Sequence, residues 1–130
     1  MTPGAVADAR RRAGETMDRP TTKILASARA TTTIASLGRY RFAALFQHGT
    51  LDAGVYAPIG EDPQQPHPRD ELYVVRTGTA EFVDADDRTA VGPGDVVFVA
   101  AHAEHRFEAM SEDFSTWVFF YGPDGGERTD

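Results

Sequence analysis

The sequence predicts a single all-β domain, either a sandwich or a barrel of short strands. From Arg39 onward, short runs of β-branched and aromatic residues alternate with Gly, Pro and Asp, which is typical of strands joined by tight turns. No segment of this part has the pattern of a long amphipathic helix. A length of 130 residues suits one domain with a core of its own.

Eight strands are predicted, and the residues between them have the composition of turns. His48–Thr50 and Asp84–Arg88 lie between apolar runs and are expected to be hairpin loops. Gly92–Asp95 has Pro second and Gly third, the pair that a type II turn prefers. The predicted strands are Arg39–Gln47, Leu51–Ala57, Leu72–Thr77, Ala80–Asp84, Arg88–Val91, Val96–Val99, Arg106–Ala109 and Ser115–Tyr121.

Both ends of the chain differ in composition from the predicted β domain. Residues 1–22 show no sustained periodicity and are predicted to be a flexible arm, with a short helix around Val6–Arg12. Residues 23–123 form the predicted barrel, and residues 124–130 a flexible tail with nothing to bury.

Charge and cysteine content exclude several functions. The net charge of −7 argues against nucleic acids and anionic membranes as partners, because both are bound through clustered Lys and Arg. Without cysteine the chain has no disulfides and no thiolate metal site, so any metal must have nitrogen and oxygen ligands. No signal peptide and no long apolar stretch are recognisable, so a soluble cytoplasmic protein is expected.

The segment Gln64–Gly78, with the sequence QQPHPRDELYVVRTG, places a histidine and a glutamate four residues apart. On one straight strand His67 and Glu71 would be about 13 Å apart, too far to bind one ion. Pro66 and Pro68 restrict the chain, however, and favour a turn that brings the imidazole and the carboxylate together. Tyr73 shares the face of Glu71 and is expected to form another wall of the same cavity.

A third ligand is expected from a different strand. His105 opens the predicted strand with the sequence HRFEA. Together with His67 and Glu71 it completes a set of two histidines and one carboxylate, with open positions for water, substrate or oxygen. This donor set suits one divalent transition metal, whether Fe, Mn, Zn, Ni or Cu.

These two segments resemble the paired motifs of the cupin superfamily of small jelly-roll barrels, also described as double-stranded β-helices. In the first motif, His67 stands where the second histidine of a His-x-His pair belongs, and the spacing from Glu71 to Gly78 matches. In the second motif, Gly94 and His105 are correctly spaced. The resemblance covers about Arg39–Pro123 and implies a cupin barrel fold.

The departures from the motifs affect the ligand set. Gln65 stands where the first histidine of the first motif belongs, and the second motif has Ala100, His102 and Ala109 in place of proline, glycine and asparagine. Gln65 is therefore expected to be either a fourth ligand through its amide oxygen or a hydrogen-bond partner of a metal-bound water. His102 is expected to be a loop residue at the rim of the barrel. His48 is expected to have a structural role in a hairpin.

The resemblance implies a metal-dependent enzyme that acts on a small organic molecule, of dioxygenase, isomerase or lyase type. Glu71 and Tyr73 are the predicted catalytic residues. The residues predicted to line the substrate pocket are Tyr56, Arg69, Tyr73, Phe98, Phe107 and Trp117. Two alternatives stay open: a non-catalytic barrel that binds or senses a small molecule, and a structural protein that binds partners through its N-terminal arm.

A homodimer is also expected. Small cupins resemble one another in pairing through exposed sheet edges, and an open jelly roll leaves such an edge available.

Overall fold

The computed structural model describes residues 22–38 and 41–129. The elements in this part of the chain are α2 (Ser27–Ala35), β1 (Phe42–His48), β2 (Leu51–Tyr56), β3 (Asp70–Thr77), β4 (Ala80–Asp84), β5 (Asp87–Val91), β6 (Val96–Val99), β7 (His105–Glu108) and β8 (Ser115–Tyr121). The predicted all-β class is confirmed, and each predicted strand has a counterpart. The helix expected around Val6–Arg12 lies outside the described residues.

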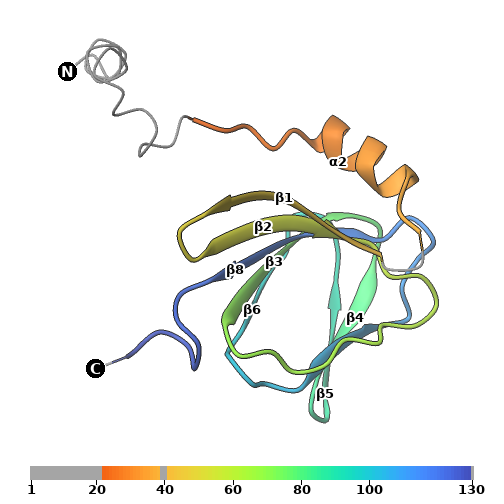
Figure 1. Cartoon of the computed structure of the whole chain (residues 1–130). Coiled ribbons are helices and arrows are strands. Elements are labelled where there is room, and N and C mark those ends of the chain that lie inside the picture. The colour runs from red at the N-terminus through yellow and green to blue at the C-terminus, as the bar shows by residue number, and fades with distance from the viewer. Residues whose placement is uncertain (1–21, 39–40, 130) are drawn as a thin grey trace, which may run out of the picture.

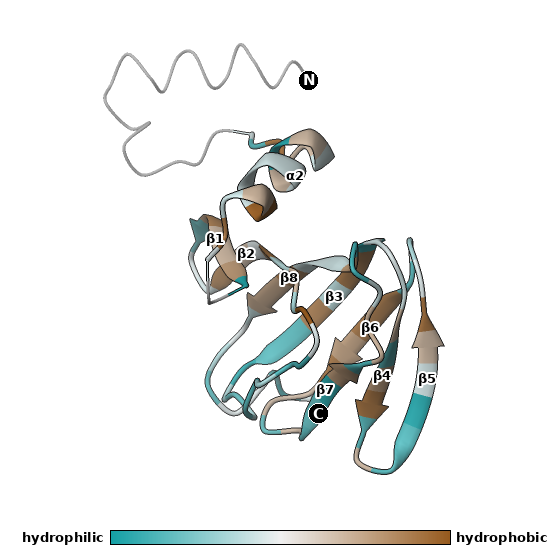
Figure 2. Cartoon of the chain, turned by 90° about the vertical axis from the view of Figure 1, so that its right-hand side faces the viewer, coloured by the Kyte–Doolittle hydropathy of each residue, from teal (hydrophilic) through white to brown (hydrophobic). Residues whose placement is uncertain are grey.

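The strands form two antiparallel sheets that face each other (Figure 1). The larger sheet has the strand order β1-β2-β8-β3-β6, and the smaller has the order β5-β4-β7. Apolar residues follow one another along β6, while β5 begins with hydrophilic residues (Figure 2). Two facing antiparallel sheets of this kind are the expected jelly-roll barrel.

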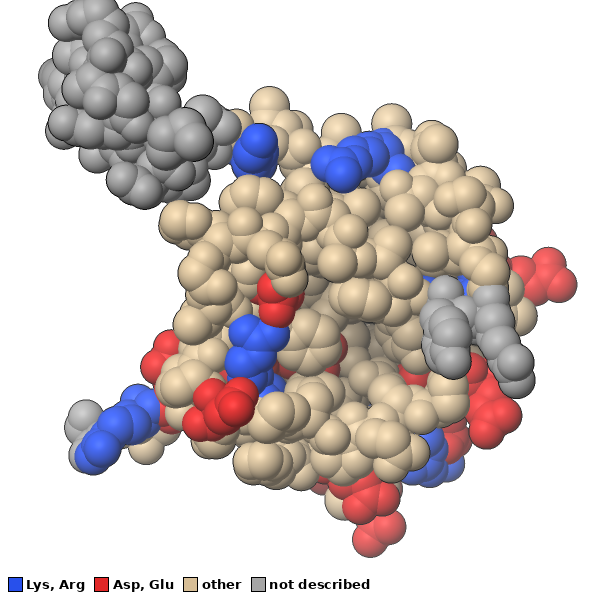
Figure 3. Space-filling view, in the orientation of Figure 1, with Lys and Arg blue, Asp and Glu red and all other residues tan. Residues whose placement is uncertain are grey.

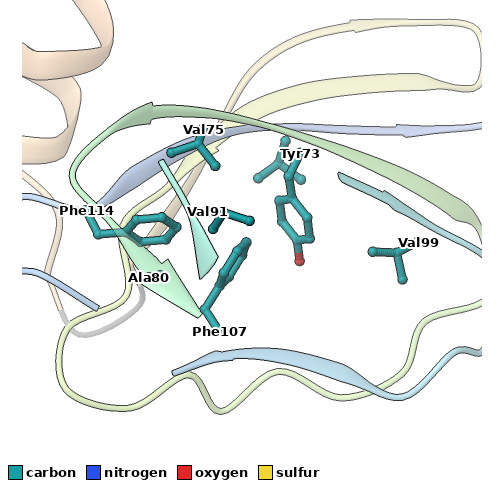
Figure 4. Packing of buried hydrophobic residues seen from close by; sticks show 8 residues of the cluster. Tyr73, Val75, Ala80, Val91, Val99, Phe107 and Phe114 are labelled. Atoms are coloured by element: carbon teal, nitrogen blue, oxygen red, sulfur yellow. The ribbon is translucent and has the colours of Figure 1, made fainter. Parts of the chain in front are cut away.

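The core fills the space between the sheets. Tyr73 and Val75 of β3 point into it and meet Phe107 of β7, Phe114 and Val118, each at most 2% exposed (Figure 4). The ring of Tyr73 contacts that of Phe107 edge-on, with the centroids 4.8 Å apart. Tyr73 and Val75 therefore lie on the inner face of β3, as the two-residue period of a strand requires.

Two glycines have backbone requirements that explain their place in the sequence. Gly94 has φ +91°, and the N–H of Asp95 donates to the carbonyl oxygen of Gly92 at 3.0 Å, as in the predicted type II turn. Gly78 ends β3 with φ +73°, and a Cβ there would lie 2.6 Å from the Phe114 backbone. A side chain at Gly78 would therefore be both strained and obstructed.

The helix α2 covers part of the outer face of the larger sheet (Figure 1). Ala30 is completely buried against that face. The guanidinium of Arg76, on β3, donates to the carbonyl and hydroxyl oxygens of Ser27 at 3.1 and 2.8 Å and to Thr31 Oγ1 at 2.9 Å. These contacts tie the helix to the barrel. This helix lies within the residues predicted to form the barrel, and the sequence did not predict it.

The C-terminal segment is tied to the start of β3 through Asp70, which is 6% exposed. The Asp70 carboxylate accepts the N–H of Ala101 at 2.9 Å and that of Glu127 at 3.0 Å, and both bonds lower the pKa of Asp70. The N–H of Gly125 donates to the Pro68 carbonyl at 2.6 Å. The tail, predicted to have nothing to bury, thus bonds to residues at the start of β3 through Gly125 and Glu127.

The outer surface carries both charged and apolar features. At the top of the face shown in Figure 3, near α2, the charged side chains are basic, whereas acidic and basic side chains lie close together lower down. On the edge strand β6, Val96 and Phe98 are 62% and 55% exposed. No helix within residues 22–38 and 41–129 is long and apolar enough to cross a membrane.

Candidate metal centre

The first two predicted ligands meet at the start of β3. His67 lies in the proline-containing segment that precedes the strand, and Glu71 is the second residue of the strand. The Nε2 atom of His67 is 2.6 Å from Oε1 of Glu71. The chain therefore turns between the two residues as the prolines indicated.

The third predicted ligand reaches the same point from the opposite sheet. His105 is the first residue of β7, and its Nε2 atom lies 3.3 Å from Oε1 of Glu71. One ligand atom from each of His67, Glu71 and His105 can be chosen so that all lie within 4.8 Å of one another. The side chains of Glu71 and His105 are 1% exposed and that of His67 is 17% exposed, so His67 is the accessible member.

Hydrogen bonds to the backbone orient both imidazole rings. Nδ1 of His67 lies 3.0 Å from the Arg69 carbonyl oxygen, and Nδ1 of His105 lies 2.9 Å from the Ala103 carbonyl oxygen. A carbonyl oxygen only accepts, so Nδ1 carries a proton in each ring and Nε2 of a neutral ring carries the lone pair. Two lone pairs then face one buried carboxylate, an arrangement that requires a positive charge at its centre.

A proton is one source of that charge. The pKa of His105 is raised and that of Glu71 is lowered, which favours a protonated imidazole beside an ionised carboxylate. Burial alone would lower the pKa of His105, but its hydrogen bonds to Glu71 and Ala103 outweigh burial and raise it. Burial alone would raise the pKa of Glu71, but hydrogen bonds from His105 and His67 outweigh burial and lower it. A divalent cation is the other source, and two imidazoles with one carboxylate fit such an ion.

Two residues that the sequence analysis did not single out, Gln64 and Asp62, complete the polar surroundings. Gln64 Oε1 accepts the Tyr73 hydroxyl at 2.9 Å and lies 3.2 Å from His105 Nε2. Gln64 Nε2 donates to Asp62 Oδ2 at 2.7 Å. The pKa of Tyr73 is raised well above its ordinary value, chiefly by burial, so its hydroxyl stays protonated and acts as a donor.

The proline content of the segment is a signal that could have identified Gln64. A proline-rich segment favours the polyproline II conformation, in which residues three apart lie on the same side. Gln64 and His67 are three apart, whereas the prediction of Gln65 rested on the His-x-His spacing of the family motif. Nothing comparable in the sequence marks Asp62.

A pocket of about 260 Å³ opens beside His67. Its lining residues are Phe42, Tyr56, Gln64, Gln65, His67, Val118 and Phe120. Most of these side chains are aromatic or aliphatic, and the ring of Phe120 meets that of His67 edge-on with the centroids 4.9 Å apart. Tyr56 lines this pocket, and its hydroxyl donates to Asp62, while its predicted contact with a substrate stays a prediction.

The other predicted pocket residues lie elsewhere. Phe107 is 1% exposed in the core, and Phe98 points outward from β6 with 55% exposure. Trp117 pairs with Val55 and Val74 across the larger sheet, which places it on the opposite face from its buried neighbour Val118.

Arg69, which was also predicted to line the pocket, lies beside it and is already bonded to other residues. Its guanidinium pairs with Asp52, donates to the Thr50 carbonyl oxygen, and lies 5.8 Å from the ring centroid of Phe120. The Arg69 side chain therefore lies next to Phe120, which lines the pocket.

The remaining glutamine and histidines lie at the surface. Gln65 is exposed and lines the pocket, so its predicted role as a fourth ligand stays a prediction. His102 is exposed with φ +66°, and its backbone N–H donates to the His67 carbonyl oxygen at 2.7 Å. His48 is exposed at the end of β1.

Comparison with known proteins gives a family model and several relatives. The family model described as "Cupin domain" matches residues 54–121, a stretch that includes His67, Glu71 and His105. An uncharacterised protein of Streptomyces coelicolor is 39% identical over 74 residues, which are 57% of this chain. The matched part spans 66% of that protein's length.

Solved structures of two further proteins are similar. A cupin superfamily protein from Desulfitobacterium hafniense has a TM-score of 0.60 and 22% identity, over 78% of this chain and 93% of that chain, and this likeness concerns the fold. The DMSP lyase DddQ from Ruegeria pomeroyi has a TM-score of 0.57 and 28% identity over 67% of this chain. That match spans 51% of the lyase chain.

Proposed function

Since the chain belongs to the cupin domain family, we propose that it is a metal-dependent enzyme acting on a small organic molecule. The ligands are His67, Glu71 and His105. The observation that supports this most strongly is the orientation of the two imidazoles, whose Nδ1–H groups donate to backbone carbonyls while both Nε2 atoms face the Glu71 carboxylate. Such backbone bonds are how metal-binding histidines are commonly oriented.

The donor set indicates the class of metal. Imidazole nitrogen and carboxylate oxygen suit divalent Fe, Mn, Zn, Ni or Cu, and the absence of cysteine leaves no thiolate to select a softer ion. When bound, the ion would polarise an oxygen of the substrate or activate dioxygen. Three protein ligands leave positions open for this.

The chain's own residues supply the proton chemistry. Glu71 is the group placed to take or return a substrate proton when its carboxylate is not bound to the ion. Tyr73 keeps its proton and donates to Gln64, so its role is to orient a polar group beside the ligands. Both residues predicted to be catalytic therefore have distinct roles in the proposal.

The pocket supports a substrate class. About 260 Å³ is below the usual range of ligand pockets, so the substrate is small. Phe42, Val118 and Phe120 offer apolar contacts, while the nearby guanidinium of Arg69 is already paired with Asp52. We therefore infer a substrate with an apolar body and one or two oxygens that reach the ion.

Dioxygenase, isomerase and lyase reactions all remain within the proposal. The likeness to a DMSP lyase supports including DMSP among the compounds tested. Small carboxylic acids and hydroxyketones with short apolar chains are the other members of the panel that the pocket supports.

The test begins with elemental analysis of protein purified without added metal or chelator. We expect about one equivalent of a transition metal in the native chain and none in the His67→Ala, His105→Ala double variant. A matched control changes the two exposed histidines, as His48→Ala with His102→Asn, because Asn tolerates the positive φ at that position. Metal in the native chain and in the control but not in the double variant, with turnover of a panel compound lost on chelation, supports the enzyme.

A non-catalytic binding barrel is the second candidate. Its support is the raised pKa of His105, whose hydrogen bond to Glu71 allows a proton to supply the positive charge that the cluster needs. In that case the metal-free protein binds a small ligand as tightly as the reconstituted protein does. No metal in any preparation, even after anaerobic reconstitution, would favour this candidate.

The expected homodimer and cytoplasmic location stay predictions. The exposed apolar side chains of Val96 and Phe98 on the edge strand β6 give the dimer a place to form. Light scattering of the native chain and of a Phe98→Asp variant tests this, and a native monomer at micromolar concentration contradicts it.

A further inference from the structure

A buried carboxylate controls the orientation of the side chain nearest the predicted ligands. Asp62 is 6% exposed, and both of its oxygens accept hydrogen bonds. Oδ1 accepts the Tyr56 hydroxyl, and Oδ2 accepts the backbone N–H of Phe107 at 2.8 Å. Oδ2 also accepts Nε2 of Gln64 at 2.7 Å.

These bonds leave Gln64 one amide orientation. A carboxylate cannot accept from a carbonyl oxygen, so the NH₂ group of Gln64 must face Asp62. The amide oxygen of Gln64 then points the other way, toward Tyr73 and His105. Tyr73 supplies one hydrogen bond to this oxygen, and the second lone pair stays available.

The free lone pair lies at the edge of the predicted metal centre. Gln64 Oε1 is 3.2 Å from His105 Nε2, and the same nitrogen is 3.3 Å from Glu71 Oε1. Adjacent ligands of a six-coordinate ion, bonded at about 2.1 Å each, lie about 3 Å apart. The spacing of Gln64 from His105 therefore matches that of the ligand pair Glu71 and His105.

We propose that Gln64 Oε1 is a fourth protein ligand of the metal, and that Asp62 is the positioning residue that turns this oxygen toward the ion. The proposal rests on the function proposed above. It differs from the motif-based expectation, which placed the fourth ligand at Gln65. Gln65 is exposed, while Gln64 is held by Asp62 and Tyr73.

An amide oxygen at this position affects metal preference. Two nitrogens and two oxygens form a harder donor set than three imidazoles with one carboxylate. Gln64 therefore favours Mn²⁺ or Fe²⁺ relative to Zn²⁺ or Cu²⁺. Replacing Gln64 with histidine should shift the ratio of affinities toward Zn²⁺.

The test measures Mn²⁺ and Zn²⁺ binding by competition with a chromophoric chelator, on the full chain. Gln64→Ala is expected to weaken Mn²⁺ binding about tenfold or more. Gln65→Ala, a matched change at the neighbouring glutamine, is expected to leave affinity within about twofold. Gln64→His is expected to raise the Zn²⁺ to Mn²⁺ affinity ratio about tenfold.

The role of Asp62 is tested by asking whether its replacement weakens metal binding only when Gln64 is present. Asp62→Asn should weaken Mn²⁺ binding in the native background and have little effect in the Gln64→Ala background, because the two residues act in series. A structural defect alone would reduce affinity equally in both backgrounds. The visible spectrum of the Co²⁺-loaded protein gives a second readout and should change for Gln64→Ala but not for His48→Ala, a change at an exposed histidine of β1.

The outcomes separate this inference from the proposed function. If the native chain binds metal through His67 and His105 but Gln64→Ala binds it as tightly as the native chain, the function stands and this inference fails. If Gln65→Ala loses metal binding and Gln64→Ala does not, the fourth ligand is Gln65, the residue at the motif position. If the native chain binds no metal after reconstitution, both proposals fail.

Discussion

His67 and Glu71 share a 2.6 Å contact between Nε2 and Oε1 that joins an accessible imidazole to a carboxylate only 1% exposed. The negative charge is buried, and its nearest partners are the two imidazoles. A buried charge of this kind is stable only if it is paired or binds a metal. In the metal-dependent protein proposed above, this contact would couple the protonation of the histidines to the binding of the ion.

Replacing the carboxylate tests this link. Glu71→Gln keeps the size of the side chain and removes its charge, so metal affinity should fall on the order of 100-fold. In chelator the same variant should change the unfolding temperature only slightly, because the charge that needed compensation is gone. Metal competition and thermal unfolding with and without chelator measure the two effects. Equal destabilisation in both conditions would show that Glu71 is structural.

The Asp70 carboxylate joins three parts of the chain, so its removal should destabilise the fold. Asp70→Ala leaves the N–H groups of Ala101 and Glu127 without their partner, at a cost of about 2 to 3 kcal/mol. Urea unfolding measures the change. Asp124→Ala, at an exposed position of the same C-terminal segment, is the matched control and should cost little.

Deleting residues 125–130 separates the two bonds. The truncated chain loses the bond from Glu127 but keeps the one from Ala101, so it should lie between the native chain and Asp70→Ala in stability. A truncated chain as stable as the native one would mean that the C-terminal segment contributes nothing to the barrel.

Arg76 anchors α2, and its replacement should loosen the helix without affecting the metal centre. Arg76→Met keeps the apolar stem and removes the bonds to Ser27 and Thr31, at a cost of about 1 kcal/mol. Hydrogen exchange of the α2 amides should become faster while metal affinity stays the same. Arg88→Met, at an exposed ion pair on the smaller sheet, is the control and should leave exchange in α2 unchanged.

The pair of Arg69 and Asp52 should make a pH-dependent contribution to stability. The hydrogen bond from Arg69 lowers the pKa of Asp52 in the folded protein. A lowered pKa stabilises the fold above the unfolded value of about 3.9, and that stabilisation is lost as the pH falls through the folded value. The pair is partly exposed, so its contribution is about 0.5 to 1 kcal/mol.

The comparison of Asp52→Asn with the native chain tests this. The variant should have the lower unfolding temperature at pH 7, and the difference should shrink below about pH 4. Asp86→Asn, in the exposed loop between β4 and β5, provides the control. A difference that is constant with pH would mean that the charge of Asp52 does not stabilise the fold.

The strands were predictable because local signals agree with the tertiary structure. Ala80–Asp84, Val96–Val99 and Ser115–Tyr121 match the strands β4, β6 and β8 at both ends. Each is a run of mainly apolar residues that ends near a turn residue. Local composition and burial therefore favour the same structure in these segments.

The helix α2 was not predictable because its stability is not local. Its sequence SARATTTIA contains three consecutive threonines, which disfavour helix. Their hydroxyls donate to the carbonyls four residues earlier, and the burial of Ala30 and the contacts with Arg76 add stability. The contacts with Arg76 join residues 45 and 49 positions apart, which no window of the sequence shows.

The predicted ligands could be identified because their spacing follows a family motif, whereas nothing in the sequence places Gln64 beside His105. His67 and Glu71 are separated by a turn that the prolines mark. Gln64 reaches His105 through a segment without regular structure, and 41 positions separate the two residues. Only the folded chain shows that they are neighbours.

The convergence of donors from two distant segments also concerns the folding of the chain. An ion held by Glu71 and His105 joins β3 of one sheet to β7 of the other, and with no cysteine the chain has no disulfide to do so. Such a cross-link stabilises the folded state in proportion to metal occupancy, by about 2.7 kcal/mol when the free metal is 100 times the dissociation constant. The unfolding temperature thus becomes a measure of metal supply, and a cell short of the metal would hold a protein that is less active and also more easily unfolded.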